Sequence, residues 1–277
     1  MARVQSRWLH FGRARPRLST SCRASGCLLH HSAVSPLRTV QTQRETPRAA
    51  ASARSGSKRF RQHVNPLSVV YHQPIELPDW TRQFADPSLP IHVDIGCARG
   101  NYLMDVAASH ATERNFVGVE IRRNVLQEAE REAKRRGLLN LAFVHANMNL
   151  HQTRLLQSLP APVTSVSIFH PDPWMKKRHV KRRLVTDAFV EEMAGQLPNG
   201  TPIYVQTDVE ELFAYMVEVF ELSKLYDFDA LHEAPLGVST DREKFVYNDG
   251  GGVFRVKFIV DKLKKKTEAK MSTSPDA

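Results

Sequence analysis

The sequence of 277 residues has only three cysteines and no apolar run long enough to cross a membrane. Two of the cysteines, Cys22 and Cys27, lie near the N-terminus, which leaves Cys97 alone in the rest of the chain. This count excludes a disulfide framework and a cysteine-based zinc site. We therefore expect neither a structural metal nor a membrane partner.

Acidic residues are nearly missing from the first 60 residues, which hold eleven arginines and Lys58 against the single acid Glu45. The whole chain has a formal net charge of +10, so the remaining residues together are close to neutral. A basic pI therefore does not by itself indicate nucleic-acid binding. Residues 1–57 are rich in Arg, Ser and Ala and lack a sustained apolar stretch, which is typical of an organellar transit peptide. A disordered basic tail that binds RNA is the alternative.

Beyond residue 90, short β-branched runs alternate with amphipathic stretches, the pattern of βαβ units around a parallel sheet. A final pair of runs predicts an antiparallel hairpin at the sheet edge. Residues 58–90 are rich in proline and predict an extended arm, residues 91–262 the folded domain, and residues 263–277 a disordered tail. The expected parallel strands span residues 91–95, 116–120, 141–145, 163–169 and 202–206.

Amphipathic stretches between these strands predict helices. One of them has Asn124 as its N-cap and Gly137 as its C-terminal stop. The others are expected at residues 101–111, 184–197 and 209–222.

Polar side chains follow the predicted strands, where an open parallel sheet binds its ligands. They are Asp94, Glu120, Asn147, Asp172 and Asp208. Each of them alone is also compatible with ordinary turn or capping chemistry. Together, on successive strands, they predict a binding site at this edge of the sheet.

The loop after the first strand favours one cofactor over another. Gly96 and Gly100 form a G-x-x-x-G pattern that lacks the third glycine of the G-x-G-x-x-G found in dinucleotide sites. Asp94, two residues before the loop, would repel a phosphate but attract an ammonium group. S-adenosylmethionine has an amino-acid group and no phosphate, so it fits better than NAD. Glu120 can accept both ribose hydroxyls, and Asn147 can bond the adenine edge.

The fourth strand is followed by HPDPWMKKRHVKRR at residues 170–183. Pro171 and Pro173 stiffen the turn around Asp172. Trp174 can stack on a base, and the cations after it can contact phosphates. The alternative for the cations is the solvated start of a helix. The two histidines of this stretch have no partners at metal-ligand spacing.

These motifs resemble the tRNA (guanine-N7)-methyltransferase family. Its signature PDPW-x-K-x-R-H-x-K-R-R stands at residues 171–183, T-D-x-E at 207–210 and T-x-x-E at 240–243. RQHVNPL at 61–67 and DIGCARG at 94–100 are most similar to the cyanobacterial and plastid branch. The resemblance covers residues 58–262, and it favours the chloroplast over the mitochondrion as the destination of the transit peptide.

The resemblance implies a Rossmann-like class I S-adenosylmethionine-dependent methyltransferase fold, with a mostly parallel sheet and an antiparallel edge hairpin. It implies methyl transfer from S-adenosylmethionine to N7 of guanosine 46 in the tRNA variable loop. A noncatalytic RNA-binding protein on the same scaffold is the alternative, and monomer and homodimer both stay open. Two departures stand out, since Asp94 replaces a glutamate found in many members and Asn147 an aspartate.

Carried over position by position, the resemblance makes Asp172 the catalytic residue. The cofactor residues it implies are Asp94, Gly96, Gly100, Glu120, Asn147 and Asp172. The substrate and RNA residues it implies are Lys176, Arg178, Lys181, Arg182, Arg183, Asp208, Thr240 and Glu243. No metal ligand is implied.

Overall fold

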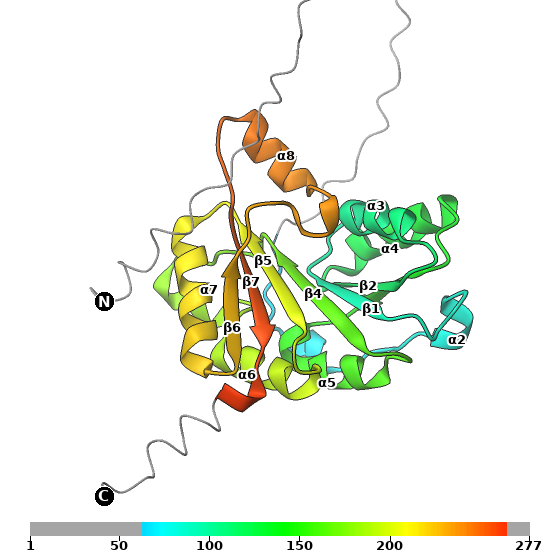
Figure 1. The fold of residues 1–277 in the computed structure, drawn as a ribbon, viewed down its shortest axis with the longest axis horizontal. Coiled ribbons are helices and arrows are strands. Elements are labelled where there is room, and N and C mark those ends of the chain that lie inside the picture. The colour runs from blue at the N-terminus through cyan, green and yellow to red at the C-terminus, as the bar shows by residue number, and fades with distance from the viewer. Residues whose placement is uncertain (1–62, 265–277) are drawn as a thin grey trace, which may run out of the picture. The chain divides into compact units, whose positions relative to one another are not determined.

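The structure is a computed structural model that describes residues 63–264. The predicted transit peptide at 1–57 and all but the first two residues of the predicted tail lie outside the described residues. The described chain forms one seven-stranded sheet flanked by helices (Figure 1). The predicted α/β fold class is confirmed.

Five strands of the sheet are parallel, in the order β3-β2-β1-β4-β5. The chain starts in the middle at β1, moves outward to β3 and then returns to place β4 on the other side of β1. This reversal creates the switch point beside which ligands bind in such sheets. The strands are β1 (Ile91–Ile95), β2 (Asn115–Glu120), β3 (Leu141–His145), β4 (Val163–Phe169) and β5 (Pro202–Thr207).

The remaining two strands are antiparallel, as predicted, but they do not form a tight hairpin. β7 (Phe254–Val260) pairs with both β5 and β6 (Tyr226–Ala230), so β6 is the edge strand. The connection between β6 and β7 contains the short helix η4 (Pro235–Gly237) and helix α8 (Asp241–Asn248). α8 was not predicted from the sequence and lies across the carboxyl edge of the sheet (Figure 1).

The helices correct two further details of the sequence analysis. α4 begins at Arg123 with Arg122 as its N-cap, so the predicted cap at Asn124 is wrong. Its predicted stop is confirmed, because Gly137 has φ +66° and the next N–H, that of Leu138, bonds back into the last turn. α5 (Met148–Ser158) was not predicted. The other long helices are α3 (Asn101–Ser109), α6 (Asp187–Gln196) and α7 (Glu210–Ser223).

Side chains alternate along the central strands and fill two apolar clusters, one on each face of the sheet. Phe116 of β2 packs with α3 and α4, whereas Val117 belongs to the cluster that includes α5, α6 and α7. The segment predicted as an extended arm also reaches this second cluster, through the buried Trp80 and Phe84 at the short helix α2 (Trp80–Gln83). The arm is therefore anchored to the core through these two side chains.

Candidate active site

The carboxyl ends of the parallel strands bring five predicted residues to one edge of the sheet. Asp94 is the most central, because β1 lies between β2 and β4 and Asp94 pairs with Gly118 on one side and Ser167 on the other. The other predicted residues at this edge are Glu120, Asn147, Asp172 and Asp208.

Asp94 is a buried carboxylate, 4% exposed, that accepts one hydrogen bond from the Ser167 hydroxyl at 2.6 Å. Within residues 63–264 it has no basic partner in an ion pair. Burial raises its pKa from 3.8 to about 7, the Ser167 hydrogen bond opposes this rise, and the Glu120 charge adds to it. A buried carboxylate without a cation favours a positively charged ligand group, so this residue fits the ammonium of S-adenosylmethionine.

The loop after β1 is pressed against β2. The N–H groups of Gly96 and Cys97 both donate to Val119 O, at 2.8 and 3.1 Å. Gly100 has φ +68°, and a Cβ there would lie 2.6 Å from the Phe143 ring, so no other residue fits without a shift. A Cβ at Gly96, in contrast, would meet no atom within 4 Å. The loop thus leaves open space beside Gly96, where a ligand could approach the backbone.

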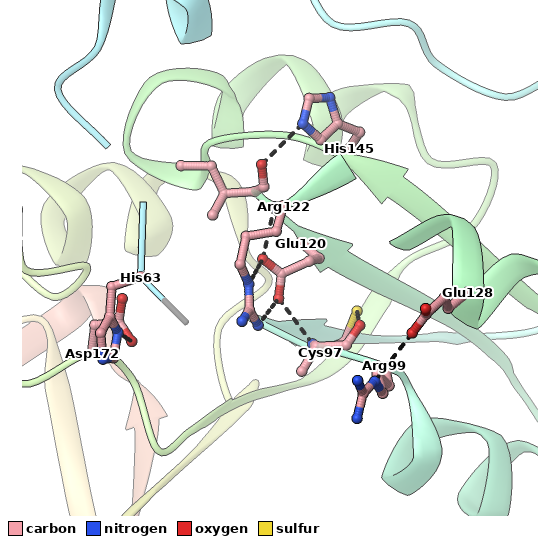
Figure 2. Close-up of polar contacts among 10 residues, drawn as sticks. His63, Cys97, Arg99, Glu120, Arg122, Glu128, His145 and Asp172 are labelled. Atoms are coloured by element: carbon pink, nitrogen blue, oxygen red, sulfur yellow. Dashed lines mark hydrogen bonds and ion pairs between the residues drawn. The ribbon is translucent and has the colours of Figure 1, made fainter. Parts of the chain in front are cut away.

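Glu120 shapes this loop through its carboxylate, which is 3% exposed. The carboxylate accepts the Ala98 N–H at 3.1 Å, the Arg122 N–H at 2.8 Å and both arms of the Arg122 guanidinium, at 3.0 and 2.9 Å (Figure 2). These bonds to Glu120 raise the pKa of Arg122. Both oxygens of the Glu120 carboxylate therefore already accept hydrogen bonds. The predicted ribose contact stays a prediction, and it requires the ribose hydroxyls to share these oxygens with Arg122.

Asn147 has a structural role at the end of β3. Its Oδ1 accepts the Asn149 N–H at 3.1 Å as the cap of α5, and its Nδ2 donates to Pro66 O at 2.8 Å. The arm is held again where His151 Nε2 donates to Tyr71 O at 2.7 Å. Between the arm and α4 lies a recess of about 490 Å³, which Asn147 lines and neither Asp94 nor Glu120 reaches. The predicted adenine contact stays a prediction.

The loop after β4 holds Asp172 with its side chain 41% exposed. Oδ1 accepts a hydrogen bond from His63 Nδ1 of the arm at 2.7 Å, at a distance from the Glu120 cluster (Figure 2). His170 and Trp174, on either side of this residue, have φ +47° and +42°. The left-handed region costs a residue other than glycine roughly 1 kcal/mol or more, so the surrounding contacts hold this loop in an unfavourable conformation.

The cations after Trp174 form the short helix η3 (Lys177–Arg182), not the start of a longer α-helix. Around Trp174, the Arg182 guanidinium lies 5.1 Å from the ring centroid and the His179 ring 5.7 Å away, edge on. Exposed side chains on this segment include the predicted RNA residues Lys176, Arg178 and Lys181.

Arg183 differs from the other cations, because it is only 9% exposed. Its Nε donates to Pro173 O at 3.0 Å, and its guanidinium lies 4.2 Å from the centroid of the Tyr215 ring. Arg183 thus anchors the Asp172 loop to α7. Direct contact with RNA by this residue stays a prediction.

Asp208, after β5, joins the same loop to α8. Its Oδ1 accepts from His170 Nδ1 at 2.9 Å, and its Oδ2 accepts from the Arg242 guanidinium at 2.6 Å. These hydrogen bonds, that of His170 first, hold the pKa of Asp208 below its ordinary value. The residue therefore stays ionised over the physiological pH range.

The late T-x-x-E motif forms the N-terminus of α8. Thr240 caps the helix by accepting the Glu243 N–H at 3.1 Å, which is the first half of a capping box. Glu243 is 2% exposed and forms a buried ion pair with Arg255, whose Nε donates to Gln206 at 2.6 Å. Both motif residues thus fix the position of α8, and their predicted contact with substrate stays a prediction.

The described residues contain no group of three or more His, Cys, Asp or Glu side chains placed to hold a metal ion. Within the same part of the chain, no helix has the length and hydropathy of a membrane span.

Comparison with known proteins decides the family. The family model described as "Putative methyltransferase" matches residues 88–256. A tRNA (guanine-N(7)-)-methyltransferase of Microcystis aeruginosa is 45% identical over 209 residues, 73% of this chain and 98% of its own. The chain belongs to the tRNA (guanine-N(7)-)-methyltransferase family. It is therefore an S-adenosylmethionine-dependent methyltransferase.

Further relatives agree with the predicted cyanobacterial branch. The tRNA (guanine-N(7)-)-methyltransferase of Thermosynechococcus vestitus is 43% identical over 203 residues, 72% of this chain and 94% of its own. Among solved structures, the 16S rRNA methyltransferase KamB aligns with 67% of this chain and 95% of its own, at 17% identity and a TM-score of 0.44.

The structure of this methyltransferase also adds residues that sequence analysis did not consider. Arg122 covers Glu120, and Arg255 neutralises Glu243. His92 and Ser167 lie beneath Asp94. Only the last pair had a signal in the sequence, since H-x-D in β1 and S-x-S in β4 place polar residues on one face of two buried strands.

Proposed function

We propose that this methyltransferase transfers the methyl group of S-adenosylmethionine to N7 of guanosine 46 in the variable loop of tRNA. The observation that carries the proposal is the pairing of two different surfaces at one sheet edge. Asp94 is a buried carboxylate that forms no ion pair with a described residue, and the neighbouring loop presents Asp172 and Trp174 next to exposed lysines and arginines. The first surface suits the cationic cofactor, and the second suits a base within an RNA.

The chemistry needs no general base in the protein. The cofactor supplies an electrophilic methyl group on a sulfonium. Guanine N7 has an in-plane lone pair and no proton, so the S–CH₃ bond breaks as the N7–CH₃ bond forms and the positive charge passes to the purine. The task of the protein is alignment of the two reactants. Asp172 orients the purine by accepting from its N–H groups, and the negative charges of Asp172 and Asp208 stabilise the cationic ring that forms.

The exposed cations hold the RNA while the base enters the site. Lys176, Arg178 and Lys181 contact phosphates on either side of the target nucleotide. Arg182 and Trp174 lie against each other, so a base that stacks on Trp174 would also lie near a positive charge. N7 within folded tRNA is partly covered, so we propose that the base leaves its tertiary contacts to reach Asp172.

Methyl transfer from labelled S-adenosylmethionine to unmodified tRNA, followed by nucleoside analysis, tests the activity. We expect 7-methylguanosine as the labelled product. A tRNA with guanosine 46 changed to adenosine tests the position and should accept no label. Absence of labelled 7-methylguanosine would contradict the proposal, and label in the altered tRNA would contradict the assigned position.

We further propose that residues 1–57 direct the protein to the chloroplast. Their composition supports this, because they are rich in Arg, Ser and Ala and nearly free of acids. A fluorescent protein fused behind residues 1–60 should accumulate in chloroplasts. Accumulation in mitochondria or the cytosol would contradict the proposal.

A further inference from the structure

Four buried polar side chains form a row beneath the site, on one face of the two central strands. His92 and Asp94 lie two residues apart in β1, and Ser165 and Ser167 lie two residues apart in β4. In the sheet, His92 pairs with Ser165 and Asp94 pairs with Ser167. The most exposed member, Asp94, is only 4% exposed. The row is thus cut off from water at every position except its end at the active site.

Hydrogen bonds connect the four side chains in one order. The Ser167 hydroxyl donates to Asp94 Oδ1 at 2.6 Å. His92 Nε2 lies 3.0 Å from the Ser167 oxygen, and His92 Nδ1 lies 2.7 Å from the Ser165 oxygen.

The donor in each of these hydrogen bonds follows from the charge of Asp94, which stands at the end of the row. An ionised carboxylate only accepts, so it takes the single hydroxyl proton of Ser167. The Ser167 oxygen must then accept the N–H of His92 Nε2. Burial, with the charge of Arg114, lowers the pKa of His92 to about 3, so the ring is neutral and Nδ1 accepts from Ser165. Every donor therefore points toward Asp94, and hydrogen bonds aligned in this way polarise one another.

We propose that His92 is a positioning residue for cofactor binding, which acts through Ser167 to hold Asp94 in the ionised form that binds the ammonium of S-adenosylmethionine. This inference rests on the proposed cofactor role of Asp94. A histidine ring that bridges two serines fixes the direction of the Ser167 hydroxyl, which could otherwise rotate. The carboxylate is then stabilised before the ligand arrives, although it lies in a buried position.

The other groups facing Asp94 do not perform this task. The thiol of Cys97 stays protonated, because burial raises its pKa. The Tyr102 hydroxyl donates to Pro235 O, and burial raises its pKa as well. Glu120 carries a charge of the same sign and raises the pKa of Asp94. Among the described residues, Ser167 is the only group that lowers the pKa of Asp94, and His92 orients it.

The test compares two ligands across pH. S-adenosylhomocysteine retains the amino-acid group, and methylthioadenosine lacks it. Their dissociation constants are measured by calorimetry between about pH 5.5 and pH 8.5, a range that spans the titration of Asp94. Titration of the ligand amine is common to all variants and cancels when variants are compared at one pH. For the wild type we expect S-adenosylhomocysteine to bind more tightly as Asp94 ionises.

The variants separate the members of the row. Ser167→Ala should move the rise in S-adenosylhomocysteine affinity upward by about one pH unit and weaken binding near pH 7 by about fivefold. His92→Phe should shift it in the same direction by a smaller amount. His92→Gln keeps an N–H where Nε2 lies and should stay close to the wild type. The affinity for methylthioadenosine should not change in any of them.

Equal losses for both ligands in Ser167→Ala and His92→Phe would overturn the inference, as would an unmoved pH profile, because either result indicates a structural role only. If His92→Phe does not fold, as judged by thermal unfolding, Ser167→Ala and Ser165→Ala decide. Ser165→Ala releases His92 from its fixed tautomer and should shift the profile by less than Ser167→Ala, and no shift in both would overturn the inference.

Two further outcomes distinguish this inference from the proposed function. A wild type that binds both ligands equally would overturn the cofactor role of Asp94 and the inference with it. A preference for S-adenosylhomocysteine that depends on Asp94 but not on His92 or Ser167 would overturn the inference alone.

Discussion

The two sides of the active site are built differently. On the side that we propose binds the cofactor, the Asp94 and Glu120 carboxylates are buried and bonded within the sheet edge. On the side that we propose binds RNA, Asp172 is 41% exposed, and the loop that carries it departs from favourable backbone conformations at both of its ends. The first side is buried and suits a small cationic group, whereas the second is exposed enough to meet a large polyanion.

This difference determines how large the effect of a substitution should be. A hydrogen bond to a buried charge contributes roughly 1.5–3 kcal/mol, whereas an exposed ion pair contributes about 0–1 kcal/mol. Substitutions on the cofactor side should therefore change ligand affinity and folding stability together. Substitutions on the RNA side should change methyl transfer or RNA binding and leave stability nearly unaffected.

The largest effect is expected for Asp172→Asn, which removes the charge that we propose orients guanine and stabilises the cationic product. Methyl transfer to tRNA should slow by about 100-fold or more. Because this side chain bonds to His63 and not to the Glu120 cluster, affinity for S-adenosylhomocysteine should fall less than about threefold. Single-turnover transfer and calorimetry on the same preparation measure both quantities. An unchanged transfer rate would remove Asp172 from the catalytic role.

Asp94→Asn should weaken S-adenosylhomocysteine binding by about 30-fold near pH 8, because a charge-assisted bond to the ammonium is lost.

The same Asp94→Asn substitution should stabilise the fold at high pH. The pKa of Asp94 is raised to about 7, so the wild type loses stability as pH rises from about 4 to about 7, and asparagine does not. We expect the free energy of unfolding of the variant to gain about 2–4 kcal/mol over the wild type at high pH.

Urea unfolding near pH 5 and near pH 8 measures this gain, which should be much smaller at the lower pH. A gain that is equal at both pH values would show that the wild-type carboxyl does not titrate in this range. It would also contradict the buried, unpaired state described for Asp94.

A triple variant should weaken tRNA binding by about tenfold at low salt; its changes are Lys176→Ala, Arg178→Ala and Lys181→Ala. The slope of log Kd against log salt concentration should fall by about two to three. A matched control replaces three exposed cations of α4: Arg131, Lys134 and Arg135. The control should stay within about twofold of the wild type. Equal effects of the two triples, measured by filter binding over a salt series, would contradict a specific RNA surface at η3.

The smallest effect is expected for His63→Ala, which removes the contact between the arm and Asp172. Both side chains are about half exposed, so the contact is worth roughly 0.2–1 kcal/mol, a change of at most about fivefold in transfer rate. His63→Gln retains a donor and should lie closer to the wild type. A loss as large as that of Asp172→Asn would show that His63 takes part directly in the reaction.

The sheet could be predicted from sequence because its signals are local. Each parallel strand is a short β-branched run, and Asp94 and Glu120 end two of them. α8 was missed, because its sequence DREKFVYN has little apolar periodicity. The helix is instead held by a cap at Thr240 and the buried pair of Glu243 with Arg255, contacts that join distant parts of the chain.

The positions of the candidate residues at one sheet edge could be predicted from the sequence, but their surroundings could not. Sequence motifs named Asp172 and the cations that follow it, yet they treated Arg183 like its neighbours. Only the fold shows that Arg183 is buried against Tyr215. Likewise, Ser167 donates to Asp94 from β4, 73 residues away, and only the fold shows that the S-x-S pattern of β4 lies beside the H-x-D pattern of β1.

The most direct test of the account is single-turnover formation of 7-methylguanosine in tRNA, measured against S-adenosylmethionine concentration for Asp94→Asn and Asp172→Asn. The account predicts that Asp94→Asn approaches the wild-type rate when the cofactor is saturating, because only cofactor affinity is impaired. Asp172→Asn should stay slow by about 100-fold at every concentration. The opposite pattern, with Asp172→Asn rescued by cofactor and Asp94→Asn not, would contradict the division of the site described above.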